Sequence, residues 1–274
     1  MYCKFCGKQI TDDSVFCAYC GKKQNDTAAP APTASASDEF AELDAFFSAA
    51  VTDMAASEAK LRKERDSLFD IENGVLIRFH NNATHVCIPE GVLRIGDKAF
   101  FGSPCLTGVT IPDSVISIGE QAFAECPCLT DVTIPNSVVH IGDYAFYKCE
   151  SLSSVTLSER MTKISRGVFK ACTALTGITI PDGVTVLGDG AFKECTALRS
   201  MTIPAGVTVI GWQTFYQCTV LQEITIPDSV MKLDRNAFSE CVSLKNVSIP
   251  AHIQYDKNRI VDAFWDCPAE ITRR

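Results

Sequence analysis

The sequence has little of what catalysis usually requires. No glycine-rich phosphate loop, no HExxH metal phrase and no GxSxG nucleophile phrase occurs in its 274 residues. The acidic residues of the repeating part sit at positions that vary from repeat to repeat, as solvated residues do. We therefore predict a protein without catalytic activity. Histidine is scarce as well, and the four are His80, His85, His140 and His252.

Positive charge and long apolar runs are also scarce. The chain has 25 Lys and Arg against 33 Asp and Glu, a formal net charge of −8, which argues against a generally basic binder of nucleic acid or membrane surfaces. No run of about 18 uncharged apolar residues occurs, so we expect no membrane insertion. Met1–Lys4 lacks the basic-then-apolar start of a secretory signal. We therefore expect a cytoplasmic protein whose thiols are reduced or bound to metal.

Cysteine is abundant, and four of the fourteen lie near the start of the chain. Cys3, Cys6, Cys17 and Cys20 follow the pattern C-x2-C-x10-C-x2-C, with a glycine after each pair. Two intervening residues let both thiolates of a pair reach one ion, and four thiolates make a closed tetrahedral site that suits Zn2+. Two disulfides or a rubredoxin-like iron site are the alternatives. The doubled CxxCG phrase resembles the short zinc-ribbon module at the N-terminus of many bacterial proteins.

A module of about 23 residues has almost no core of its own. We therefore predict that residues 1–23 fold around one structural zinc ion. Four lysines and two aspartates give this module a net charge of 4 − 2 = +2, which hints at contact with nucleic acid or a transcription complex. Six charges make no continuous basic stripe, so we favour a structural or protein-docking role and do not expect nucleic acid as a partner.

Two segments separate this module from the rest of the chain. Residues 24–37 are rich in Ala, Ser, Thr and Pro, which predicts a flexible linker. Residues 38–72 place apolar side chains at steps of three and four, which predicts one long amphipathic α-helix. Its apolar stripe could cover the first turn of the next domain. The alternative is a dimer formed through a coiled coil of residues 38–68.

Residues 73–274 repeat with a period of 23. An unbroken register of this kind specifies a solenoid, whose stacked coils form a parallel β-sheet. Within one coil, the alternation in Leu106–Ile111 predicts a strand, Pro112 ends it, and Gly119 permits a turn. Two of the repeated core sets are Phe100, Phe123, Phe146, Phe169, Phe192, Phe215 and Phe238, and Cys126, Cys149, Cys172, Cys195, Cys218 and Cys241.

The six repeated cysteines form a ladder inside the predicted solenoid. A redox-active set or a second metal site is one interpretation, but we expect small buried hydrophobic residues, because burial raises the pKa of a thiol and makes it inert. We expect Cys267 to be a core residue as well, although the register has slipped before it. Cys105 and Cys128 differ, since they occupy equivalent positions in adjacent coils. We predict that they lie within reach of a disulfide and stay reduced in the cell.

The consensus L-x-x-V-T-I-P-x-x-V-x-x-I-G-x-x-A-F-x-x-C-x-x resembles the BspA-like, or Treponema-type, leucine-rich repeat, from about Val75 to Cys267. The resemblance implies a mainly β, right-handed curved solenoid without enzymatic activity that binds other proteins. The best-known members of that family are surface adhesins, which is the alternative role here. Gly74–Ile88 predicts a hairpin over the first coil, and the polar insertion Gln254–Asn258 predicts a cap at the other end.

Variable side chains on the regular strands are where a partner would be recognised. A row of threonines beside them could bind ice, but the high β-propensity of threonine explains the row without any function. An aromatic stripe outside the strands could anchor a partner, although packing between coils explains it as well. We predict a scaffold that docks an unknown protein on its concave face, with the zinc ribbon as a second contact module. The predicted contact residues are Asp131, Ser154, Ser200, Glu223, Asn246, Tyr147, Trp212 and Tyr216.

Overall fold

A computed structural model describes residues 68–80, 82–253 and 263–274. The chain divides into two compact units, Met1–Asp70 and Ile71–Arg274. The described strands belong to the second unit, apart from the first two residues of β1 (Phe69–Glu72). The predicted zinc ribbon, the linker and the predicted helix up to residue 67 lie outside the described residues.

The predicted helix cannot extend to residue 72, because Phe69–Glu72 form strand β1. This strand neighbours β2 (Val75–Phe79) in a sheet. The two are joined by Asn73 and Gly74, which have φ angles of 50° and 76°. Positive φ at both turn residues is typical of the type I′ turn of a two-residue hairpin. Sheet pairing therefore overrides the helical pattern at this end of the segment.

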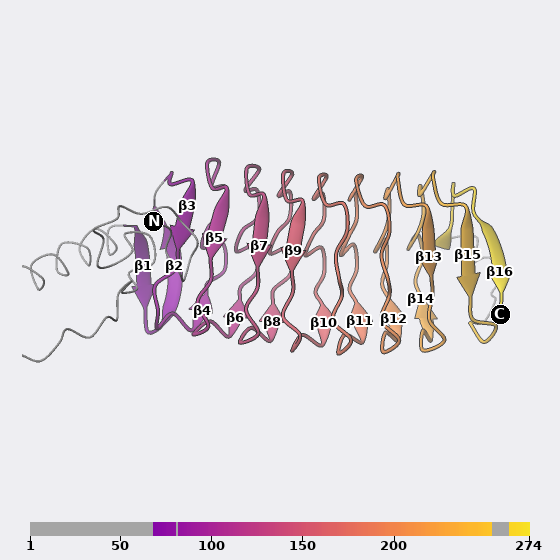
Figure 1. The fold of residues 1–274 in the computed structure, drawn as a ribbon, viewed down its shortest axis with the longest axis horizontal. Coiled ribbons are helices and arrows are strands. Elements are labelled where there is room, and N and C mark those ends of the chain that lie inside the picture. Colours follow the sequence, from indigo (N-terminus) through magenta and orange to yellow (C-terminus); the bar gives the residue numbers. More distant parts are fainter. Residues whose placement is uncertain (1–67, 81, 254–262) are drawn as a thin grey trace, which may run out of the picture. The chain divides into compact units, whose positions relative to one another are not determined.

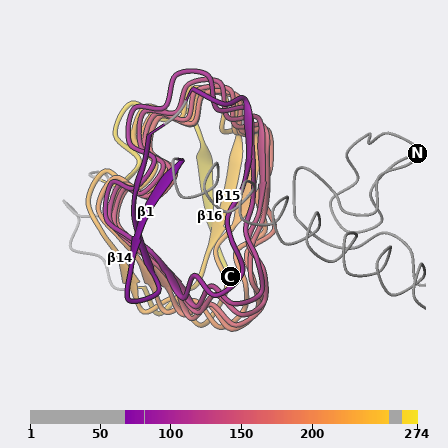
Figure 2. The same cartoon turned by 90° about the vertical axis from the view of Figure 1, so that its left-hand side faces the viewer.

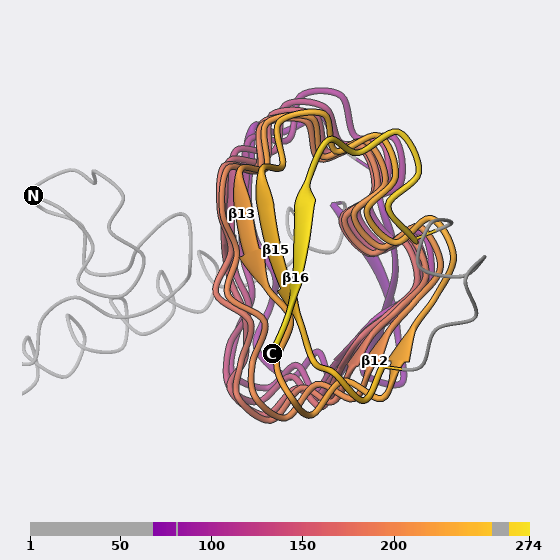
Figure 3. The same cartoon turned by 90° about the vertical axis from the view of Figure 1, so that its right-hand side faces the viewer.

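Ile71–Arg274 forms a β-solenoid of stacked coils (Figure 1). A regular coil has a longer and a shorter strand, and views along the stack show the two kinds of strand on different sides of the coil (Figures 2 and 3). The longer strands are β3 (His85–Cys87), β5 (Gly108–Thr110), β7 (Asp131–Thr133), β9 (Ser154–Thr156), β13 (Glu223–Thr225), β15 (Asn246–Ile249) and β16 (Glu270–Arg273).

The second side of the coil carries the two-residue strands, which follow β1 and β2 in the stack. These are β4 (Arg94–Ile95), β6 (Ser117–Ile118), β8 (His140–Ile141), β10 (Lys163–Ile164), β11 (Val186–Leu187), β12 (Val209–Ile210) and β14 (Lys232–Leu233). The sheets run β1-β2-β4-β6-β8 and β10-β11-β12-β14 on this side, and β3-β5-β7-β9 and β13-β15-β16 on the other. Strands of successive coils pair in parallel, as the repeat predicts.

The phenylalanines at the repeated core position form a continuous stack. The seven rings from Phe100 to Phe238 are each at most 1% exposed. Successive ring centroids in this set lie between 4.7 and 5.7 Å apart, within the range of stacked aromatic contacts. Phe264 extends the stack at 5.1 Å from Phe238, although the repeat register has shifted there. The prediction of a phenylalanine core is confirmed.

The cysteine ladder is buried as predicted, and it also holds adjacent coils together. The six thiols from Cys126 to Cys241 are fully buried. Each donates its S–H to the backbone carbonyl of a phenylalanine 26 residues earlier, at Sγ–O distances of 3.0 to 3.3 Å. Burial raises the pKa of Cys126 to about 11 and that of Cys195 to about 12. The thiols therefore remain protonated, as donation requires.

The repeated glycine is required for close approach between coils, and Gly119 stands at the start of the predicted turn, which begins at Glu120. The φ of Gly119 is not positive. A Cβ at Gly119 would lie 2.6 Å from the backbone nitrogen of Asp97 in the preceding coil, so only glycine fits without a shift. The left-handed turn comes two residues later, at Gln121, with a φ of 53°.

The predicted hairpin over Gly74–Ile88 is also wrong. The strand β2 pairs with β4, whereas β3 pairs with β5, so the two lie in different sheets. Both pairings are parallel, which makes Val75–Cys87 a first coil of the solenoid rather than a cap folded on itself. The hairpin at this end is β1–β2, with its turn at Asn73–Gly74. The predicted C-terminal insertion at Gln254–Asn258 lies outside the described residues.

Candidate functional site

Five of the predicted contact residues share one position on the longer strands. Asp131 lies opposite Ser154, and Ser200 forms a bridge opposite Glu223, which in turn lies opposite Asn246. All five side chains are exposed. Parallel pairing in register places equivalent residues of adjacent coils about 4.8 Å apart, so the set forms an outward row that is interrupted at Gly177, which has no side chain.

This row extends one coil further than the sequence analysis predicted. Glu270, the first residue of β16, lies opposite Asn246 and is exposed. The 23-residue period does not predict Glu270 as the equivalent of Asn246, because the repeat register is shifted in the coil that precedes Glu270. The phrase Glu270-Ile271-Thr272 repeats Glu223-Ile224-Thr225, and this signal could have identified the residue. We call the set the strand-face row: Asp131, Ser154, Ser200, Glu223, Asn246 and Glu270.

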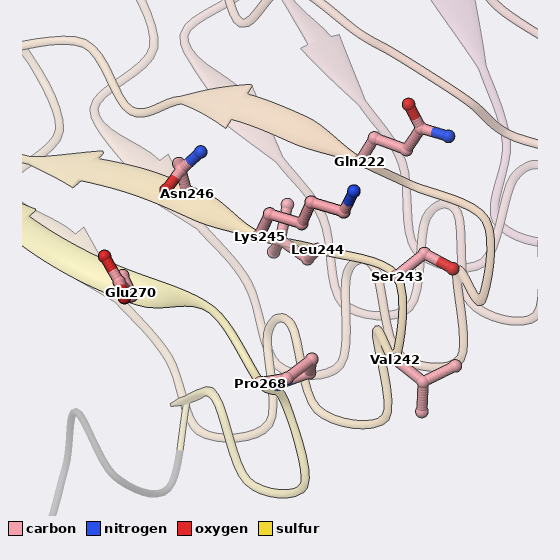
Figure 4. Close-up of a pocket in the computed structure, with 8 residues that line it drawn as sticks. All are labelled: Gln222, Val242, Ser243, Leu244, Lys245, Asn246, Pro268 and Glu270. Carbon is pink, nitrogen blue, oxygen red and sulfur yellow. The ribbon is translucent and has the colours of Figure 1, made fainter.

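The strand-face row ends in an open depression of about 760 Å³ (Figure 4). Its origin is a shortened loop. Five residue steps separate Cys241 from Asn246, whereas three separate Cys267 from Glu270 in the next coil. The shorter loop leaves uncovered space beside the preceding coil, between Val242 and the chain that enters β16. The residues lining it are Gln222, Val242, Ser243, Leu244, Lys245, Asn246, Pro268 and Glu270.

The depression combines an apolar side with both signs of charge. Val242 is 54% exposed there, beside the buried Leu244. Lys245 directly precedes β15 and Glu270 begins the adjacent strand β16, while Asn246 adds an amide with both donors and an acceptor (Figure 4). Such a surface can take an apolar side chain while it pairs with a carboxylate and an amine of the same partner.

The three predicted aromatic contact residues lie elsewhere on the coil. Trp212 lies two residues after the short strand β12 and is 49% exposed. Tyr147 and Tyr216 are half-buried and occupy equivalent positions in the turns after β8 and β12. The structure therefore divides the eight predicted contact residues between two separate surfaces.

The predicted zinc ligands Cys3, Cys6, Cys17 and Cys20 lie outside the described residues. Within the described ranges, no group of three or more His, Cys, Asp or Glu residues could hold a metal ion. In the same ranges, no helix is both long and apolar enough to span a lipid bilayer.

The cysteines at positions 105 and 128 are exposed and free.

Comparison with family models identifies both parts of the chain. The model of the BspA type leucine rich repeat region matches in six copies over residues 78–199 and 187–268. The zinc-ribbon domain model matches residues 2–24, which supports zinc binding by the first module. No enzymatic domain is among these matches. No curated protein matches the chain.

Solved structures include similar solenoids. A leucine-rich-repeat protein of T. pallidum is 29% identical, with a TM-score of 0.62, and the match covers 65% of this chain and 88% of that one. A leucine-rich cell surface protein of Faecalibacterium prausnitzii is 27% identical, with a TM-score of 0.48, over 69% of this chain and 59% of that one. The repeat scaffold suits a protein-interaction or adhesin-like role. Because the repeat model covers well over half of its residues, the chain belongs to the BspA-type leucine-rich-repeat family.

Proposed function

We propose that this protein is a non-enzymatic cytoplasmic scaffold that docks a partner protein on the strand-face row. The observation that carries this proposal is the row itself. Its six side chains are exposed, follow one line across paired strands and differ from coil to coil. A rigid ladder that presents variable side chains is suited to recognising an extended protein surface.

The depression at the end of the row indicates the chemistry of that partner. Its apolar side chains would bury a hydrophobic anchor, and such anchors supply most of the affinity of a protein interface. Lys245 and Glu270 would pair with charges of opposite sign at the rim. The proposed partner surface therefore has one apolar side chain between an acidic and a basic residue.

The zinc ribbon serves in this proposal as a structural module and second contact. Cys3, Cys6, Cys17 and Cys20 would hold one Zn2+ ion, and four thiolates in two CxxC pairs match the donor set that zinc prefers. Elemental analysis of the intact chain under reducing conditions should find about one equivalent of zinc. A different metal, or no metal after purification without chelators, would contradict this part of the proposal.

Crosslinking followed by affinity capture from the native cell tests the docking surface. We expect the double variant Asp131→Lys and Glu223→Lys to recover roughly tenfold less of the partner captured by the parent chain, because two of the three negative charges of the row are reversed. The matched control is Glu159→Lys with Asp182→Lys, which reverses two exposed charges outside the row. Equal recovery with both double variants would refute docking on the row.

Cell fractionation tests the proposed location and separates it from the adhesin-like alternative. A cytoplasmic scaffold is recovered with the cell contents and is protected from protease added to intact cells. Protein that is digested on intact cells would instead support an adhesin.

A further inference from the structure

A second hollow, of about 280 Å³, lies in the turns that follow the short strands β10, β11 and β12. Two glycines, Gly167 and Gly190, contribute to its lining. Both have positive φ, like the residues at the same position of other coils. Those residues carry side chains, and they are Lys98, Gln121, Tyr144, Gln213 and Asn236.

The glycines explain why space is available there. A Cβ at Gly167 would come within 2.3 Å of Cε1 of Tyr144, so the ring of Tyr144 lies over this glycine. A Cβ at Gly190 would meet no atom closer than 3.7 Å. The position above Gly190 is therefore open, with the ring of Tyr144 on one side and Gln213 of the next coil on the other.

The lining of this hollow is positively charged, although the chain as a whole is acidic. Arg166, Lys170 and Lys193 face one carboxylate among the lining residues, that of Asp189. An oxygen of Asp189 accepts the backbone N–H of Trp212 at 2.9 Å. Arg166 is exposed, and among the described residues no carboxylate lies within 4.0 Å of its guanidinium group. Its charge is therefore available to a ligand.

Aromatic rings hold the two lysines in place. The ammonium group of Lys193 lies 4.6 Å from the ring centroid of Tyr216 and 5.9 Å from that of Trp212. It also donates to Oε1 of Gln213 at 2.8 Å and lies 3.7 Å from a carboxylate oxygen of Glu194. The ammonium group of Lys170 lies 5.4 Å from the ring of Tyr147. Contacts with ring faces orient a cation and leave its remaining N–H groups free to donate.

We propose that this hollow binds an acidic peptide segment, in which carboxylates pair with Arg166 and Lys170 and an apolar side chain lies against the exposed ring of Trp212. Guanidinium and ammonium groups beside a flat ring match this combination. The volume accommodates one or two side chains, and Asp189 opposes the continuous negative charge of a nucleic-acid backbone. This site goes beyond docking on the strand-face row and does not depend on it.

Intrinsic fluorescence tests the proposal directly, because the chain has two tryptophans. With Trp265→Phe in the full-length zinc-loaded protein, Trp212 is the sole reporter. We expect a saturable change in its emission when the protein is titrated with the peptide Gly-Glu-Asp-Leu-Glu-Asp-Gly, blocked at both ends. The affinity for this peptide should fall as the salt concentration is raised. The same peptide with Gln and Asn in place of its acidic residues should not bind.

Three variants in the Trp265→Phe background distinguish binding in the hollow from non-specific attraction between the peptide and the positive charges of the protein. Arg166→Gln with Lys170→Gln should raise the Kd roughly tenfold or more, since two charge-assisted contacts are lost. Gly190→Gln should also raise it, because this change fills the open position and removes no charge. The matched control, Lys98→Gln with Arg199→Gln, removes two exposed cations that line neither the hollow nor the depression, and it should leave the Kd unchanged.

Four results would overturn the proposal. The first is no binding of the acidic peptide to the parent, and the second is equal binding of the neutral peptide. The third is an equal loss of affinity in the control variant. The fourth is tighter binding of a single-stranded oligothymidylate through Arg166 and Lys170, which would assign the hollow to nucleic acid. Circular dichroism of each variant verifies that the solenoid remains folded.

Discussion

Alkaline pH should destabilise the solenoid through its cysteine ladder. Burial raises the pKa of Cys126 to about 11 and that of Cys195 and Cys241 to about 12, from an ordinary thiol value of 9.0. Burial also raises the pKa of the other three well above that value. A raised folded-state pKa means that the contribution of these thiols to stability is complete below pH 9. It then falls as the pH rises from 9 toward the folded-state value.

The size of this effect follows from proton linkage. At pH 10 an unfolded thiol is roughly 90% ionised while a ladder thiol keeps its proton, so each thiol lowers the free energy of unfolding by about 1.4 kcal/mol. Six independent thiols would lower it by about 8 kcal/mol, which is comparable with the whole stability of a typical domain. The solenoid should therefore be much less stable at pH 10 than below pH 9.

The variant Cys195→Ser isolates one thiol from all other titrating groups. Serine keeps a donor for the carbonyl of Phe169, which the thiol contacts at 3.1 Å, but its hydroxyl does not ionise in this range. Near pH 10, its free energy of urea unfolding should fall less steeply than that of the parent, by about 1.2 kcal/mol per pH unit. The exposed Cys105→Ser is the control and should match the parent. Equal slopes for all three proteins would refute the account of the ladder.

Two further predictions concern packing and thiol proximity. Phe169→Ala should lower the free energy of urea unfolding by roughly 3–5 kcal/mol, because the ring is fully buried between two stacked neighbours, each 5.7 Å away. Phe101→Ala, at a 46% exposed position, is its control, and equal losses would contradict the stacked core. Mild oxidation should link Cys105 to Cys128, since adjacent coils are about 4.8 Å apart. Mass spectrometry of the digested protein would detect this link, and its absence would disprove the proximity.

The solenoid could be predicted because its core residues recur without insertion. The period places a phenylalanine equivalent to Phe169 and a cysteine equivalent to Cys172 in successive coils. Residues of one type at the same position of successive coils must stack on one another. The period does not reveal what a residue does there. The S–H donation of Cys172 to the carbonyl of Phe146 depends on the path of the backbone, and so does the close approach at Gly119.

Some of the features that the sequence analysis failed to predict are indicated by a recognisable sequence pattern, and others are not. Asn73–Gly74 is a strong hairpin signal, but the helical pattern before it favoured a continuous helix. The sequence placed the aromatic contact residues outside the strands, but equal spacing along the chain does not show on which side of a coil they lie. The hollow beside Trp212 arises from Gly190, where a missing side chain matters only because its neighbours are bulky.

Site-specific photo-crosslinking in the native cell tests the central claim most directly. A benzophenone amino acid would replace Ser200 or Asn246 on the strand-face row, or Asp182 outside it. The account predicts a covalent adduct with the same partner protein from Ser200 and Asn246, and none from Asp182. Adducts from all three positions alike, or from none of them, would contradict docking on the strand-face row.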